Sequence, residues 1–302
     1  TENDGAIEDG AAISIVNRTG YKGLSNIEGK DGKFKANGTN AAVKAYKWED
    51  QTASAFDNSK NVVAISGGTF SSEVDKSLCA DGYIPTQNAD GTYGVKEGKF
   101  VAEIGSQGYE SLQAAIEAAQ DGQTVTLLAD AAEDVVISKS ITLDLGGKTL
   151  TNTNAGKATI SVQSGTVTVK NGNVVGGNDY YNIEAKKDAN LTLTDVTATA
   201  GNNGSSMIDN WGTLTITSGT YTGGLNVVKS EEGSKLTITG GTFTLDYATN
   251  GYTGVIFAYG DTTISGGEFI QNLTTTGRWN HPTVILTGVV EGYTAITRVT
   301  GG

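Results

Sequence analysis

The chain has 302 residues, and its 33 acidic side chains exceed its 21 basic ones, which gives a formal net charge of −12. Binding to nucleic acid or to an anionic membrane surface needs a basic footprint, so this charge argues against both kinds of partner. No apolar run approaches membrane-spanning length, and a single cysteine cannot form an internal disulfide. The 42 Gly and only 2 Pro suit many tight corners between strands whose ladders use every backbone N–H.

The first part of the chain is typical of the end of a solenoid. Strand-like segments cover 13–17, 42–46 and 62–65, and the last of them runs into Ile65-Ser66-Gly67-Gly68-Thr69-Phe70. A hairpin is then predicted from 82–85 to 92–95, with Asp90-Gly91 at its turn. We assign 1–71 to terminal turns of a β-helix and 72–102 to a closing hairpin and linker.

One amphipathic helix is predicted over 109–121, because Leu112, Ala115, Ile116 and Ala119 recur on one face at helical spacing. Gly122 stands where a C-terminal glycine is expected. The first turn of a β-helix exposes an apolar core and an unpaired strand edge, which a helix can cover. We therefore interpret 103–302 as a second β-helix that this capping helix opens.

A repeated phrase organises the remaining sequence, as in Ile238-Thr239-Gly240-Gly241-Thr242-Phe243. Its apolar anchor, just before each turn, recurs at steps of 22 to 26 residues at Leu145, Val169, Leu193, Ile216, Ile238, Ile264 and Val289. A period in the twenties, with two-residue alternation inside each unit, predicts a solenoid in which one repeat makes one turn.

Each repeat predicts three short strands. In the first strand, Leu236 and Ile238 point inwards, while the intervening threonine points outwards. Glycine supplies the positive φ of the corner, and the aromatic residue that follows begins the second strand facing inwards. The third strand is expected at 226–228 or 255–258. The predicted fold class is all-β, a right-handed parallel β-helix of 22–26 residues per turn with one capping α-helix and a mid-chain β-hairpin cap.

Two stretches carry a resemblance to known proteins. The segments 69–74, 80–83 and 88–95 resemble the closing part of β-helical repeat modules in large secreted, adhesin-like surface proteins of gut Firmicutes. The segment 109–125, together with 141–145, is similar to the opening of pectate-lyase-like β-helices. The resemblance implies a right-handed parallel β-helix that is secreted or lies at the cell surface, or alternatively belongs to a phage particle. It does not define an activity, because this scaffold also serves tailspikes, lyases and glycosidases.

The distribution of acidic residues argues against an enzyme. Hydrolysis of a glycosidic bond needs two carboxyl groups on opposite sides of it, roughly 5–10 Å apart. Here the aspartates are scattered singly, without an Asp-Asp pair, at Asp144, Asp179, Asp188, Asp195, Asp209, Asp246 and Asp261. The one histidine, His281, and the few arginines do not occur in the motifs of β-helical lyases or hydrolases. We expect a protein without catalytic residues, and a polysaccharide lyase or glycosidase is the alternative.

A ligand site is predicted at the loops between the second and third strands. Aromatic faces with amide and carboxylate edges suit sugar rings, and these loops bring both kinds of group to one corner. The same aromatic residues could instead only cover the strand ends, and we interpret Trp211 as a packed corner residue. The candidate glycan-binding residues are Tyr180, Tyr181, Asn178, Asp179, Tyr247, Asn250, Tyr252, Arg278, Trp279 and Asn280.

No cofactor is expected, because no His/Cys cluster or calcium-loop pattern occurs. A surface calcium ion at an Asp/Asn corner stays open, without an assigned position. The chain starts in solenoid-like sequence without a lid and ends without a closing hairpin, so the expected partners are copies of itself, or tandem repeats, packed head to tail. Host or bacterial glycans are the other expected partners, and neither nucleic acid nor membrane insertion is expected.

The predicted function is that of a non-enzymatic, extracellular structural or adhesin-like β-solenoid module in a fibre, filament or stalk. The alternative is a carbohydrate-binding or polysaccharide-processing β-helix, including a tailspike-like protein of a phage.

Overall fold

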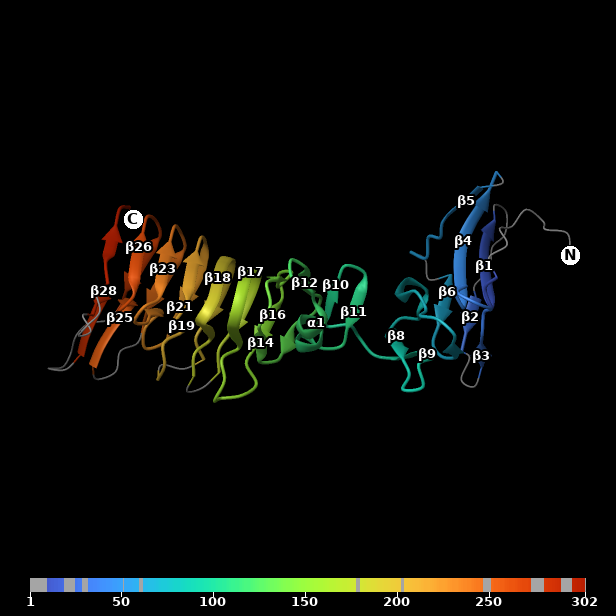
Figure 1. Ribbon diagram of the computed structural model, residues 1–302, viewed down its shortest axis with the longest axis horizontal. Helices are drawn as coiled ribbons and strands as arrows, with labels where there is room; N and C mark the ends of the chain where they lie inside the picture. Colours follow the sequence, from blue (N-terminus) through green and yellow to red (C-terminus); the bar gives the residue numbers. More distant parts are fainter. Residues whose placement is uncertain are drawn as a thin grey trace, which may run out of the picture. The chain divides into compact units, whose positions relative to one another are not determined.

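The computed structural model describes residues 10–18, 25–28, 32–50, 52–59, 62–177, 180–201, 204–246, 251–272, 280–288 and 295–301. The chain divides into two compact units, 1–99 and 100–302. Figure 1 labels the elements of both. In the described part of the chain, no helix has the length and apolar character needed to cross a bilayer.

The first unit stacks one set of three strands on the next. The strands β1 (Ile13–Arg18), β2 (Ser25–Ile27) and β3 (Lys33–Phe34) pair in parallel with β4 (Val43–Glu49), β6 (Val63–Ile65) and β7 (Thr69–Phe70), respectively. A side strand, β5 (Thr52–Ala55), pairs antiparallel with β4. This is solenoid geometry, and the stacked rings of Phe34 and Phe70, 5.3 Å apart, lie in its core.

The predicted hairpin is confirmed. After a short 3₁₀ helix, η1 (Lys76–Leu78), the strands β8 (Tyr83–Gln87) and β9 (Tyr93–Glu97) pair antiparallel, with Gly91 at a φ of 82° in the turn. The strand β9 also pairs antiparallel with β7. The hairpin therefore occupies the edge that would otherwise continue the parallel stack.

The second unit opens with a cap. Its strand β10 (Ala102–Ile104) pairs antiparallel with both β11 (Gln107–Tyr109) and β12 (Thr124–Leu127). The helix α1 (Leu112–Ala118) is shorter than the predicted 109–121, because 107–109 is committed to the β10 ladder and the backbone of Ala119 is extended. Leu112, Ala115, Ile116 and Ala119 are all buried, as predicted.

Side chains from the following turn hold α1 in place. The Glu133 carboxylate accepts hydrogen bonds from the backbone N–H groups of Leu112, at 2.8 Å, and Gln113, at 3.0 Å. The Gln113 side-chain amide accepts a hydrogen bond from the Val136 N–H at 2.8 Å and donates one to the Val136 carbonyl at 3.3 Å. It thus satisfies both backbone groups of Val136, the two groups that a neighbouring strand would otherwise bind. Lys139 Nζ donates to the carbonyl of Ala119 at 2.6 Å, at the other end of the helix. The helix is therefore fastened at both ends over the first turn.

Three parallel ladders build the rest of the unit (Figure 1). The first ladder contains β12, β15 (Thr142–Asp144), β17 (Ile160–Val175), β18 (Ile183–Thr199), β20 (Thr213–Ile216), β23 (Lys235–Ile238), β26 (Asp261–Ile264) and β29 (Thr297–Val299). The second contains β13 (Ala131–Ala132), β16 (Thr149–Thr151), β17, β18, β21 (Gly219–Thr222), β24 (Thr242–Leu245) and β27 (Glu268–Gln271). The third contains β14 (Val135–Ile137), β17, β18, β19 (Ile208–Asn210), β22 (Val228–Ser230), β25 (Gly251–Ala258) and β28 (Asn280–Thr287). The predicted fold, a parallel β-helix, is therefore confirmed.

The internal stack of the first ladder is shifted from the prediction at both ends. Val169, Leu193, Ile216, Ile238 and Ile264 pair in series and are buried, as predicted. The partner of Val169 is Leu143, however, and not Leu145. Both leucines face the core, because alternate side chains of a strand share a face, and only the register separates them. The partner of Ile264 is Val299, whereas Val289 lies outside the described residues.

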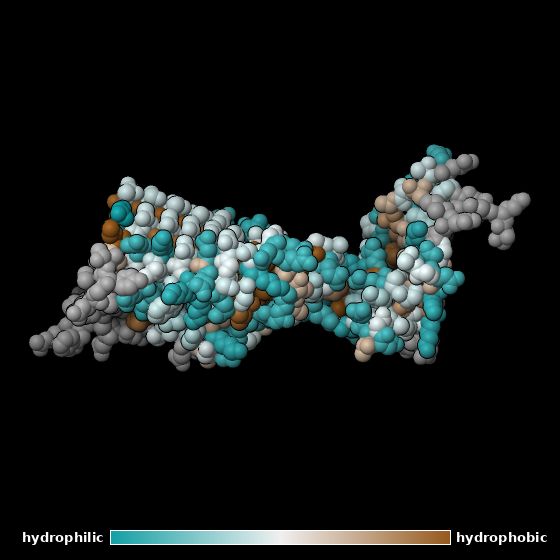
Figure 2. Space-filling model, in the orientation of Figure 1, coloured by the Kyte–Doolittle hydropathy of each residue, from teal (hydrophilic) through white to brown (hydrophobic). Residues whose placement is uncertain are grey.

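The corner chemistry follows the prediction. The second glycine of the repeated phrase has a φ near +110° at each occurrence, as at Gly241 with 109° and Gly267 with 110°. The aromatic residues behind these glycines stack inside the second ladder, where the ring centroids of Tyr221 and Phe243, and of Phe243 and Phe269, are 5.0 Å apart. The exterior of the solenoid is mostly hydrophilic or neutral on the face that Figure 2 shows.

Candidate functional site

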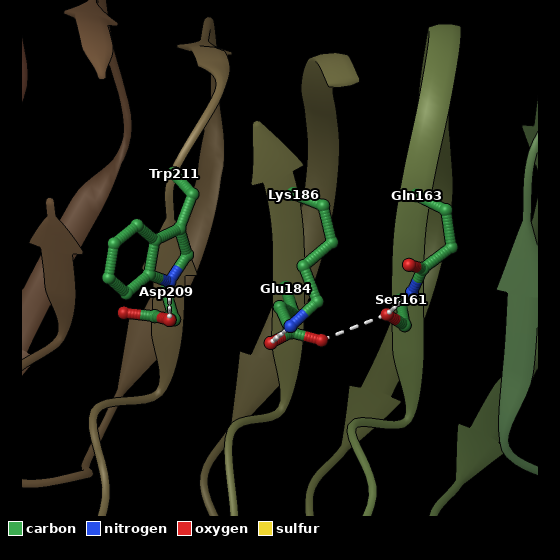
Figure 3. Close-up of polar contacts among 6 residues, drawn as sticks. All are labelled: Ser161, Gln163, Glu184, Lys186, Asp209 and Trp211. Carbon is green, nitrogen blue, oxygen red and sulfur yellow. Dashed lines mark hydrogen bonds and ion pairs between the residues drawn. The ribbon is translucent and has the colours of Figure 1, made fainter. Parts of the chain in front are cut away.

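The outward face of the third ladder carries a strip of polar and aromatic side chains. The pairing register aligns Ser161, Glu184, Asp209, Lys229 and Phe257 in one row across successive strands. The residue two positions after each of these lies on the same face by alternation. These second residues are Gln163 and Lys186 within β17 and β18, and Trp211, Glu231 and Tyr259 one position past the ends of β19, β22 and β25. We call these ten residues the polar strip, and Figure 3 shows the six that come from β17, β18 and the end of β19.

Glu184 is the centre of one buried network in the strip. Its side chain accepts a hydrogen bond from Ser161 Oγ at 2.9 Å and forms an ion pair with Lys186 Nζ. Gln163 Nε2 donates to Ser161 Oγ at 2.7 Å, which extends the network by one side chain. Partial burial opposes the charge of Lys186, but the hydrogen bond and the negative charge of Glu184 outweigh it and raise the Lys186 pKa. The negative charge of buried Glu184 is therefore balanced by the adjacent Lys186 ammonium.

Trp211 is the most exposed large ring of the strip. Its side chain is 44% exposed, yet its indole Nε1 donates to Asp209 Oδ2 at 2.7 Å (Figure 3). The interpretation of Trp211 as a packed corner residue is therefore wrong. The sequence around it explains the position. Asn210 is buried inside and accepts the N–H of Gly212, and a Cβ at Gly212 would lie 2.4 Å from the carbonyl oxygens of Lys186 and Ala189.

Asp209 lies beneath Trp211 and is completely buried. Burial raises the pKa of Asp209 to about 7, a hydrogen bond from Trp211 lowers it, and the charge of Glu231 raises it. The second carboxyl oxygen, Oδ1, is buried without a hydrogen-bond partner among the described residues. Asp209 is therefore protonated to a large extent near neutral pH, unlike an ordinary aspartate.

The next strand supplies a second ion pair, between Lys229 Nζ and Glu231. Tyr181 belongs to the same electrostatic environment from the segment before β18. Burial, followed by the negative charges of Asp209 and Glu231, raises the Tyr181 pKa to about 12. The Tyr181 hydroxyl therefore stays protonated and can donate a hydrogen bond at neutral pH.

The strip has a hollow at each end. The first has a volume of about 360 Å³ and is lined by Gln163, Lys186, Lys187, Asp188 and Trp211. The second has a volume of about 290 Å³, and its walls include Tyr181, Asn226, Lys229, Phe257 and Tyr259. Each hollow combines an aromatic wall with amide or amino groups, and Lys186 and Lys229 are already paired with buried carboxylates. This is chemistry suited to the apolar faces and hydroxyl edges of sugar rings.

The structure brings only part of the predicted glycan site together. Tyr180 and Tyr181 are neighbours, with ring centroids 4.8 Å apart, and Tyr181 lines the second hollow. Tyr252 and Asn280 come from the paired strands β25 and β28, where Asn280 pairs with Gly251, the residue before Tyr252. The side chains of these two residues, and the remaining predicted residues, lie outside what is described: Asn178, Asp179, Tyr247, Asn250, Arg278 and Trp279.

Most of the polar strip was missed by sequence reasoning, which looked for ligand residues in loops. Glu184, Asp209 and Lys229 lie on strands instead. The sequence pattern that marks these residues is a pair of polar residues two positions apart, repeated in the third strand of successive turns. This pattern can be recognised only when the register of the strands is known.

The described residues include no group of three or more His, Cys, Asp or Glu side chains arranged to hold a metal ion. No protein-family model, curated protein or solved structure matches the chain.

Proposed function

We propose that this chain is a non-enzymatic, extracellular, adhesin-like β-solenoid module that binds a glycan on its polar strip. The observation that carries the proposal is Trp211. Its ring is exposed on a rigid sheet, while its N–H is tied to a buried carboxyl group. An exposed ring that is already oriented loses little conformational freedom when a sugar stacks on it, so its apolar face can contribute to affinity.

The arrangement favours a linear glycan over a single sugar. The two hollows lie at opposite ends of the strip, and each has its own aromatic wall, Trp211 in one and Tyr259 with Phe257 in the other. A chain of sugars that crosses the strands obliquely would contact both, whereas a monosaccharide fills only one.

The charges favour a neutral glycan. Lys186 is paired with Glu184, and Lys229 is paired with Glu231. Asp209 has no exposed surface, and its pKa of about 7 leaves about half of the molecules protonated there at neutral pH. The polar strip therefore offers hydrogen-bonding groups with little net charge, and Lys187 and Asp188 at the first hollow carry opposite charges, so the site has no excess charge of one sign to attract a strongly charged polysaccharide.

Burial also supports binding over catalysis. Glu184 is 4% exposed, Glu231 is 7% exposed and Asp209 is not exposed at all, so these carboxyl groups do not stand on opposite sides of an open cleft. Polysaccharide processing remains the second candidate function, and release of reducing ends from any bound polysaccharide would favour it.

For the assembly, we propose head-to-tail packing with copies of the chain or with tandem repeats. The last described strand of the first ladder, β29, pairs on one side with β26. Val299 in β29 is 57% exposed, and Ile296 just before the strand is 45% exposed. An open strand edge next to exposed apolar side chains is a template for a further strand. Filaments in micrographs of the purified chain would support contacts between chains, and a monomer at all concentrations would exclude them.

Glycan binding is tested with an array of neutral and acidic oligosaccharides and the Trp211→Ala variant. We expect retention of neutral oligosaccharides and a loss of about 1–3 kcal/mol of binding free energy in the variant, because the stacking surface is removed. The matched control is Val136→Ala, which removes an equally exposed side chain (45%) of the same ladder outside both hollows. Equal binding by the Trp211→Ala variant and the wild type would overturn the proposal.

A further inference from the structure

Within the residues that the structure describes, the buried carboxyl group of Asp209 has too few hydrogen-bond donors around it for a carboxylate. Its carboxyl group is fully buried, and Oδ2 accepts a hydrogen bond from the Trp211 indole at 2.7 Å. The other oxygen, Oδ1, is buried without a partner among the described residues. A buried carboxylate oxygen without a donor costs desolvation energy, whereas a carboxylic acid at the same place can donate.

The groups around Asp209 identify the acceptor for a proton on its carboxyl group. From β18, Glu184 is already paired with Lys186, and Tyr181 faces the cluster from the preceding segment. Glu231 directly follows β22, and its backbone N–H donates to the carbonyl of Asn210 at 2.8 Å, which places its side chain within hydrogen-bonding reach of Asp209. Glu231 is also paired with Lys229. Two carboxyl groups are both acceptors when ionised, so a hydrogen bond between them requires that they share a proton.

We propose that Asp209 and Glu231 hold one proton between them, and that its release converts the polar strip from a charge-balanced form to a form with one excess negative charge. This regulation rests on the proposed function of the strip as a glycan site, but the proton itself does not. The exchange is a plain acid dissociation, in which the proton passes to water and no bond between heavy atoms changes.

The electrostatics place the transition near neutral pH. Burial is the largest effect and raises the Asp209 pKa to about 7, and the charge of Glu231 and the hydrogen bond to it act in the same direction. The Trp211 N–H and the Lys229 ammonium act in the opposite direction. One pH unit below the transition about nine in ten pairs carry the proton, and one unit above it about one in ten does.

Proton release changes the support of Trp211. The Trp211 N–H lowers the Asp209 pKa, which means that it binds the ionised carboxylate more strongly than the acid. Proton release therefore strengthens the hydrogen bond that orients the indole ring. We expect the oriented form of Trp211 to be populated more fully above the transition than below it, so that affinity for a neutral glycan rises about 3-fold to 10-fold as pH rises through the transition.

The test follows the Trp211 indole ¹⁵N–¹H resonance of the full chain from about pH 5 to about pH 9, a range that brackets the transition. The expected result is a single titration near neutral pH. Asp209→Asn should abolish it, because an amide keeps an acceptor for Trp211 and supplies a permanent N–H to Glu231. Glu231→Gln should shift it to lower pH, because the neighbouring negative charge is gone. Glu268→Gln, which changes an exposed acid on β27 outside both hollows, is the control and should leave the titration unchanged.

A Trp211 resonance that is constant over this pH range, or one that titrates equally in the Asp209→Asn variant, would overturn the proposal. The glycan arm is read separately. A titrating Trp211 without glycan retention at any pH would reject the proposed function and leave the shared proton standing. Retention that depends on pH in the wild type but not in Asp209→Asn would support both.

Discussion

Replacement of Ile216 by Ala tests the internal stack that holds the solenoid together. Ile216 is fully buried between Leu193 and Ile238, which are its ladder partners on either side. At about 0.8 kcal/mol per buried CH₂, the lost carbons account for about 2.4 kcal/mol. The backbones above and below are fixed by parallel hydrogen bonds and cannot collapse into the gap, so a cavity contribution raises the expected loss to about 3–4 kcal/mol.

Urea unfolding of the full chain, followed by near-ultraviolet circular dichroism of the stacked aromatic rings, measures this loss. The matched control is Thr215→Ala, one residue earlier on the same strand, where the side chain faces outwards and is half-buried. Its loss should stay below about 1 kcal/mol. Equal losses in the two variants, or a loss below about 1 kcal/mol for Ile216→Ala, would refute the assignment of an inward stack at this register.

Further predictions concern the cap and the polar strip. Glu133→Ala should destabilise the second unit by about 1–2 kcal/mol in the same unfolding assay, because two N–H groups at the start of α1 lose their acceptor; an unchanged midpoint would show that the helix is held by burial alone. Gly212→Ala should weaken glycan retention and broaden the Trp211 resonance, since its Cβ would meet two carbonyl oxygens at 2.4 Å; a wild-type spectrum would contradict this. Tyr259→Ala should reduce affinity for long oligosaccharides about 5-fold or more and leave short ones unaffected; an equal effect on both lengths would argue against a chain across both hollows. Relative to Asp209→Asn, the wild type should lose up to about 1.4 kcal/mol of stability per pH unit as pH rises from about 5 to about 7, because a folded pKa of about 7 lies above the unfolded one and the native state then binds more protons; parallel stability curves would exclude a raised pKa.

The solenoid could be predicted from the sequence because its rules are local. Alternation places Leu236 and Ile238 inside, and the corner glycines need positive φ, so both can be found without a structure. The register is not local. Leu143 and Leu145 satisfy the same alternation, and only the pairing with Val169 decides between them. The step from Ile264 to Val299 also exceeds the repeat length, which hides the last strand from a search for periodicity.

The polar strip was harder to predict for the same reason. Glu184, Asp209 and Glu231 are far apart in the sequence, and each looks like an isolated surface acid. Their burial and mutual influence arise only when adjacent strands are stacked in register. The sequence favoured Trp211 as a packed corner residue, whereas in the structure buried Asn210 takes the inward position and the Trp211 ring lies outside.

The cap of the second unit has a consequence for synthesis. The strand β10 and the helix α1 precede every turn of the ladders in the sequence, so the capped end of the second unit leaves the ribosome before the turns that stack on it. Each later turn then finds a finished strand edge on which to form. At about 5–20 residues per second, one turn of some two dozen residues emerges every 1–5 s, which is slow compared with the formation of a strand pair. The solenoid can therefore grow turn by turn in the order of translation, and at any moment a single unfinished edge is exposed to other nascent chains.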